Sequence, residues 1–238
     1  MHTTSTSATL DDDQPLLMSH FDDLEQQHDA SNLGMWFFLA TEVMFFSGML
    51  AAYAIYRSLS PEAFHLGSRH MHLWLGFANT LVLLTSSLTM ALGVRASQLG
   101  RRNQVVWYLL ATAVLGIAFL GVKAVEYTKE INHHLFPGKH FVVPADDAEA
   151  LMKVSATPEE LHLNLGRFQM MFVLYFCLTA VHAFHMIVGI VIVLIMAELM
   201  RRKWFSGHGT TQIEVLGLYW HFVDVVWVFL YPLLYLID

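Results

Sequence analysis

Seven residues that can exchange protons or bind metals interrupt long apolar stretches of this sequence. An ionisable side chain at the centre of a bilayer costs at least about 2.5 kcal/mol unless it is paired, protonated or hydrated, so each needs an explanation. Such groups serve as metal or haem ligands, as proton carriers or as hydrogen-bonding groups between helices. The seven are Glu42, Lys123, Glu126, His182, His185, His221 and Asp224.

His221 and Asp224 lie three residues apart in the aromatic-rich stretch 218–231. Residues at this spacing share one face of a helix. A proton relay or a pair of ligands is one interpretation of two such groups in an apolar run. We expect the structural alternative, in which the two side chains bond each other and neighbouring helices and so fix how the last helix packs.

His182 and His185 share a helix face in a second apolar stretch, residues 179–189. A membrane metal or haem site would combine these imidazoles with further ligands from other helices. The groups available for that role are Glu42, His221 and Asp224. An independent membrane metalloprotein is therefore one hypothesis for this chain.

Other features of the sequence oppose that hypothesis. The Glu-x-x-His pairs that mark di-iron helix bundles are missing. Cys177 is the single cysteine, which excludes disulfides and cysteine-built metal sites within the chain. Nucleotide-binding and hydrolase motifs do not occur. We predict that this chain has no metal site and no catalytic residue, and that its buried histidines bond across helices.

Glu42 and the pair Lys123 and Glu126 each allow two interpretations. Glu42 lies in the middle of the apolar stretch 36–46, where it is either a proton-linked or lipid-headgroup-contacting site or a protonated carboxyl bonded to a neighbouring helix. Lys123 and Glu126 are three residues apart near the end of a stretch, where they form an ion pair or extend their charged ends toward the membrane interface, and we expect a structural role.

The composition indicates the elements that must hold these residues. Of 238 residues, 55% are hydrophobic and 14% charged, which is too apolar for an ordinary soluble domain. A helix needs about 20 mostly apolar residues to cross a bilayer. We predict an all-α polytopic membrane helix bundle. Its five transmembrane helices are expected at about 33–56, 72–96, 104–130, 168–200 and 213–237.

Basic residues in short loops predict the orientation of the bundle. Positive charges fill the loops after the second and fourth predicted helices, and such loops stay on the cytoplasmic side. The N-terminus is then inside and the C-terminus outside. The residues concerned are Arg95, Arg101, Arg102, Arg201, Arg202 and Lys203.

The segments outside the predicted helices are polar. Residues 1–32 form an acidic tail, with a short amphipathic segment expected around 16–24, and residues 33–238 form a single transmembrane domain with an outer loop at 131–167. In that loop, Thr157 and Pro158 are expected to cap and begin a short surface helix. The net charge of −7 argues against a nucleic-acid partner.

Several motifs together resemble subunit III of the haem–copper terminal oxidases. The stretch around His221 and Asp224 is similar to the family's most recognisable motif, and the other matches follow in the family order through all five predicted helices. The matching segments are Tyr219–Trp227, Phe38–Phe46, Glu126-Tyr127 and Thr179–Gly189. Ala180 stands where the family usually has glycine, and the loop 131–167 is longer than in the mitochondrial form.

The resemblance implies an accessory, non-redox subunit of a proton-pumping cytochrome c oxidase. Such a subunit packs on the catalytic subunit I, in a complex with subunit II and other respiratory subunits, and supports sustained turnover and proton uptake. Haem and copper are then expected in the partner subunits and none in this chain. Bound phospholipid is also expected, because in the seven-helix mitochondrial form it fills a cleft beside two helices that this chain lacks.

The sequence also bears on the location of the protein and leaves alternative functions open. We expect a bacterial inner membrane rather than a mitochondrial one. Within the family, the five-helix protein associated with nitric oxide reductase is an alternative. From other classes, the independent metalloprotein remains, as does an ion carrier that uses Glu42 and Asp224, although the sequence lacks the inverted repeat that many transporters show.

Overall fold

A bundle of long helices forms the protein. The computed structural model describes residues 24–132, 135–138, 141–202 and 210–236, and this part of the chain contains helices and no strand. Five helices are long and apolar enough to cross a membrane, which confirms the predicted all-α membrane bundle. The long helices are α1 (Leu24–Leu59), α3 (Leu73–Gln98), α4 (Arg102–Asn132), α6 (Pro158–Arg201) and α7 (Thr210–Tyr235); the short ones are α2 (Pro61–Ser68) and α5 (Ala145–Val154).

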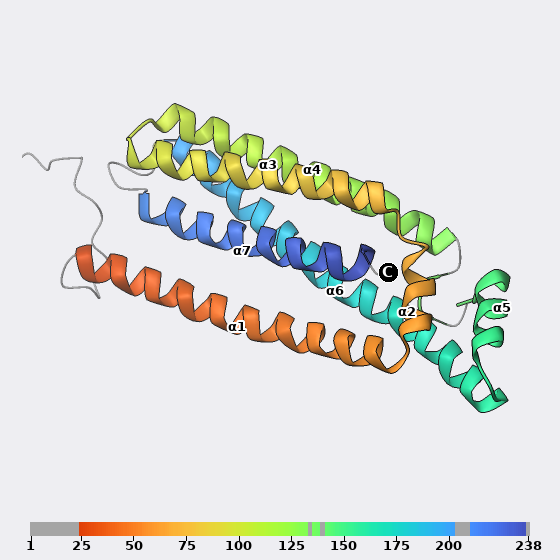
Figure 1. Cartoon of the computed structure of the whole chain (residues 1–238). Helices are drawn as coiled ribbons and strands as arrows, with labels where there is room; N and C mark the ends of the chain where they lie inside the picture. Colours follow the sequence, from red (N-terminus) through yellow and green to blue (C-terminus); the bar gives the residue numbers. More distant parts are fainter. Residues whose placement is uncertain (1–23, 133–134, 139–140, 203–209, 237–238) are drawn as a thin grey trace, which may run out of the picture.

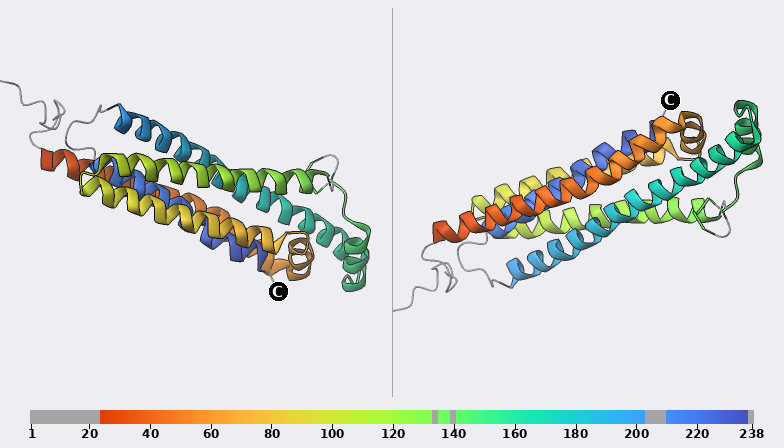
Figure 2. Two further views of the ribbon diagram at one scale, coloured as in Figure 1. Left: turned by 90° about the horizontal axis from the view of Figure 1, so that it is seen from above. Right: turned by 90° about the horizontal axis from the view of Figure 1, so that it is seen from below.

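Helix α7 lies at the centre of the arrangement. It contacts α3, α6 and α1, while α4 packs against α3 and α6. In Figure 1, α7 runs between the α3–α4 pair and α1, and α2 and α5 lie at one end of the bundle. The two views in Figure 2 show that the five long helices run roughly along a common direction. Side chains of α7 therefore reach three neighbouring helices.

Two glycines let bulky side chains of α7 fill the core. Trp220 and Trp227 are almost completely buried. A Cβ atom added at Gly116 would lie 3.0 Å from the Trp220 ring, and one added at Gly189 would lie 3.0 Å from the Tyr219 ring. Small residues allow close helix packing in membranes, where apolar burial alone does not drive association. These glycines thus set how closely α4 and α6 approach α7.

The basic turns lie at the same end of the bundle, as their charge suggested. The Arg102 side chain donates a 2.8 Å hydrogen bond from Nε to the Met200 carbonyl at the end of α6. Gln98 donates a 2.8 Å hydrogen bond to Glu214 near the start of α7. At the opposite end, His70 and Asp147 form a 2.6 Å hydrogen bond that ties α5 to the residues after α2.

Two helices are longer than predicted. Helix α1 begins at Leu24, so residues 24–32 of the predicted tail are helical; the rest of the expected amphipathic segment, 16–23, lies outside the described residues. Thr157 does cap α6, since its hydroxyl accepts a 3.2 Å hydrogen bond from the Glu160 amide. The prediction of a short surface helix there was wrong, because no second proline lies within α6 and the helix runs unbroken over 44 residues.

Candidate functional site

Glu42 of α1 and His185 of α6 form a half-buried pair. His185 Nε2 lies 3.1 Å from Glu42 Oε2, and the two side chains are 13% and 18% exposed. His185 Nδ1 lies 2.8 Å from the Val181 carbonyl, which only accepts, so Nδ1 carries a hydrogen. Nε2 then either accepts the proton of a neutral Glu42 or donates its own to a carboxylate. In both states one proton lies between the two groups and the pair is neutral overall.

Aromatic groups surround this pair. The rings of Phe46 and His185 are 5.5 Å apart, and Tyr219 of α7 donates a 2.9 Å hydrogen bond to the His185 carbonyl. The Glu42 carboxyl therefore has a partner on a neighbouring helix, as one of its two interpretations required. The contact joins α1 to α6 at the side of the bundle where α7 also touches both.

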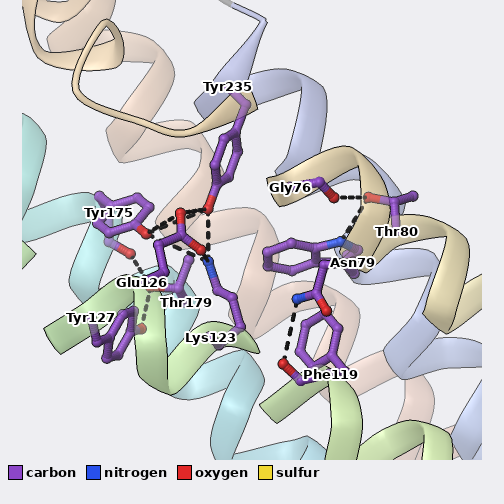
Figure 3. A network of polar contacts seen from close by, with 11 residues as sticks. Gly76, Asn79, Thr80, Phe119, Lys123, Glu126, Tyr127, Tyr175, Thr179 and Tyr235 are labelled. Carbon is purple, nitrogen blue, oxygen red and sulfur yellow. Dashed lines mark hydrogen bonds and ion pairs between the residues drawn. The ribbon is translucent and has the colours of Figure 1, made fainter. Parts of the chain in front are cut away.

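Lys123 and Glu126 of α4 form the predicted ion pair inside the bundle (Figure 3). Lys123 Nζ donates to Glu126 Oε2 at 2.8 Å, and both residues are almost completely buried. Tyr175 and Tyr235 donate their hydroxyls to the other carboxylate oxygen, Glu126 Oε1. Lys123 also lies 4.8 Å from the centre of the Trp227 ring, a favourable cation–π distance. Both charges are thus compensated without water.

The tyrosines of this cluster were missed by sequence reasoning. Tyr175 and Tyr235 belong to α6 and α7 and lie 49 and 109 residues from Glu126 along the chain. Tyr127, next to Glu126, bonds Thr179 of α6. Nothing in local spacing indicates these contacts, because helical periodicity only relates residues of one helix. The cluster therefore joins α4, α6 and α7 at the end where α7 terminates.

His182 makes none of the hydrogen bonds that we expected across helices. Its ring packs against Phe119 at 5.5 Å and Trp227 at 5.2 Å between centroids, and neither ring nitrogen has a partner among the described residues. The aromatic walls explain this, since they offer no acceptor. Within the same residues, His, Cys, Asp and Glu side chains form no group of three that could hold a metal ion.

The predicted direct bond between His221 and Asp224 is also wrong. His221 Nδ1 lies 2.8 Å from the hydroxyl of Ser87 on α3, whereas both oxygens of the buried Asp224 carboxyl lack a hydrogen-bond partner among the described residues. The Ser87 side chain is the polar group beside Asp224, but not at hydrogen-bonding geometry. One hydroxyl of α3 therefore stands between two groups that share a face of α7.

Comparison with known proteins places these features in a family context. A family model described as "Cytochrome c oxidase subunit III" matches residues 22–136 and 168–238. The chain is 28% identical over 204 residues to cytochrome c oxidase subunit 3 of Alkalihalophilus pseudofirmus, which covers 86% of this chain and 85% of the relative. It is 29% identical over 213 residues to the subunit 3 of Synechocystis, covering 88% and 76%.

Oxidases named for a different electron donor also match, at somewhat lower identity. The chain is 25% identical over 220 residues to cytochrome bo(3) ubiquinol oxidase subunit 3 of Pseudomonas aeruginosa, which covers 90% of each protein. The family match leaves out residues 137–167, which contain α5 and the first turns of α6. The seven ionisable residues of the candidate site all lie within the matched ranges, as does most of each long helix.

Proposed function

Since the chain belongs to the cytochrome c oxidase subunit III family, we propose that it is an accessory, non-redox subunit of a proton-pumping oxidase that packs on the catalytic subunit I. The observation that carries this proposal is the extent of the family match, which includes residues of all five long helices. The polar groups of the bundle support the non-redox role. Lys123 and Glu126 compensate each other, and Glu42 is bonded to His185.

The haem and copper that reduce oxygen belong, in this proposal, to the partner subunits. The contacts of three histidines in the bundle support that assignment. His182 is enclosed by aromatic rings, His185 bonds Glu42 and Val181, and His221 bonds Ser87. Each of these three imidazoles therefore has its own contacts, and none shares a contact partner with another.

We assign the Glu42–His185 pair a proton-linked role that supports proton uptake by the complex. One proton is shared by the two groups, and both side chains are partly accessible rather than sealed in the core. An accessible acidic group flanked by aromatic rings also suits contact with a phospholipid headgroup, so bound phospholipid is part of the proposal. The N-terminal end of the bundle faces the proton-uptake side of a bacterial inner membrane, because the basic turns gather there.

Two candidate functions of the complex differ in the electron donor. Relatives of similar identity are named cytochrome c oxidase and quinol oxidase subunits. We propose cytochrome c as the donor and keep quinol as the second candidate. Oxygen uptake by the purified complex with reduced cytochrome c, compared with a reduced quinol, decides between them.

Deleting this chain from the complex tests the accessory role. Subunit I purified without it is expected to begin turnover at nearly the normal rate and then to lose activity sooner than the complete complex. Loss of all initial oxygen uptake, with haem content unchanged, would instead assign the chain a direct part in catalysis. An unchanged working lifetime would remove the supporting role.

A further inference from the structure

The part of α7 that runs between α3 and α1 in Figure 1 carries exposed apolar side chains. Residues three or four apart place His221, Val225 and Phe229 on one face of this helix. Val225 is 50% exposed and Phe229 65% exposed, and His221 is half-buried. Leu84, one turn from Ser87 on α3, is 50% exposed along one side. We call this surface, defined by His221, Val225, Phe229 and Leu84, the α7 face.

His221 is a polar group on this apolar face, in the middle of a span. Its Nδ1 atom is occupied by Ser87, and its Nε2 atom has no hydrogen bond within the described residues. Other polar side chains exposed in the spans behave differently. The hydroxyls of Thr41 and Thr85 bond carbonyls of their own helices, as expected for groups that face lipid. An imidazole nitrogen that points away from its own helix has no such solution, and acyl chains offer no partner.

The contact with Ser87 leaves one ring nitrogen of His221 unpaired. A neutral imidazole has one donor nitrogen and one acceptor nitrogen, and the contact with Ser87 uses Nδ1. Nε2 therefore presents a donor or an acceptor to the outside. A polar atom in an apolar environment is costly without a hydrogen bond, so Nε2 requires a hydrogen-bonding group there.

We propose that the α7 face is the seat of a membrane-spanning helix of the partner subunit, and that this helix presents a hydrogen-bonding group to His221 Nε2. The inference rests on the proposed function as an oxidase subunit and adds the surface and the residue. Lipid is the poorer occupant because its acyl chains offer no hydrogen-bonding group at this depth. A helix that enters between α1 and α3 also contacts α7, so three helices of this chain support it.

Two valines give a matched test of this surface. Val225 lies on the α7 face and is 50% exposed; Val114 on α4 is 64% exposed and lies outside the α7 face. Val225→Trp and Val114→Trp add the same bulk to exposed positions within the spans. The tagged full chain is purified from native membranes with its complex, and haem per chain is measured. We expect Val225→Trp to lower the haem retained by at least about tenfold and Val114→Trp to leave it unchanged, because an overpacked interface loses 1–3 kcal/mol.

Replacement of His221 tests the hydrogen bond itself. His221→Leu is expected to lower retained haem about threefold, within the range of one interhelical hydrogen bond, and His221→Gln to restore part of it because the amide can donate or accept a hydrogen bond. Equal retention by both valine variants, or loss with Val114→Trp, would overturn the proposal whatever the histidine variants do. A wild-type chain that carries no haem would instead remove the proposed function, on which this inference depends.

Discussion

His185 of α6 holds Glu42 of α1 through one shared proton across a 3.1 Å contact. The outward faces of α1 are apolar and exposed, with Trp36 and Met44 among the most exposed side chains. The polar pair therefore gives α1 a defined attachment to α6.

The Glu42→Gln variant distinguishes a role of Glu42 in attaching α1 to α6 from a role in proton exchange. The amide still bonds His185, so we expect the chain to assemble normally, while the complex loses its shared proton and inactivates sooner during turnover. Oxygen uptake followed to exhaustion measures this lifetime. Glu25→Gln, an exposed position on the same helix, is the control. Unchanged turnover stability, proton pumping and lipid content in Glu42→Gln would leave the residue without a functional role.

The buried ion pair predicts strong coupling between its two members. Lys123→Met leaves the Glu126 charge buried without its counter-ion, so we expect the free energy of unfolding to fall by about 3–5 kcal/mol. The double variant Lys123→Met/Glu126→Gln is expected to lose much less than the sum of the single variants. Denaturant unfolding of the purified complex gives the three values.

The pair Glu149 and Lys153 provides the comparison for that experiment. These residues form a 2.7 Å ion pair on α5 with both side chains largely exposed. Lys153→Met is expected to cost less than about 1 kcal/mol, because water screens the interaction. Equal costs for Lys123→Met and Lys153→Met would show that the buried cluster does not act as a coupled unit.

Gly116 predicts a position where added volume disrupts the core. A side chain there meets the Trp220 ring at 3.0 Å, so we expect Gly116→Leu to destabilise the bundle by about 1–3 kcal/mol. Gly121, on the same helix, has no atom within 4 Å of a built Cβ, and Gly121→Leu is the control. Thermal unfolding compares them; a Gly116→Leu protein as stable as Gly121→Leu would contradict the close contact of the Trp220 ring with Gly116.

The contact between His70 and Asp147 predicts local control of α5. Asp147 is buried and bonded to His70, whereas its neighbour Asp146 is exposed. We expect Asp147→Ala to speed amide hydrogen exchange within 145–154 and to leave the long helices protected; Asp146→Ala should change neither. Exchange that spreads into α6 would show that α5 supports the bundle rather than resting on it.

The sequence was informative where the determining interactions are local. Hydropathy located the five spans, and the spacing of Lys123 and Glu126 predicted their ion pair. It failed for His221 and Asp224, because Ser87 of α3, 134 residues from His221, takes the bond that helical spacing suggested. The partner of Glu42 is likewise 143 residues away. Tertiary packing decides such contacts, and the periodicity of one helix holds no information about it.

The length of α6 shows the same limit in another form. Thr157 and Pro158 are correct signals for a helix start, but no proline between 159 and 201 ends the helix before the span begins. The surface helix and the span were therefore predicted as separate elements although the chain runs through both. Only the packing of α2 and α5 against α6 distinguishes its outer part.

Purification of this chain from its native membrane tests the central claim most directly. The account predicts that a tag on this chain recovers a stable complex with a haem-bearing catalytic chain, identified by mass spectrometry, and that the complex consumes oxygen. Recovery of this chain alone, stable and without any haem-containing partner, would contradict its assignment as an oxidase subunit.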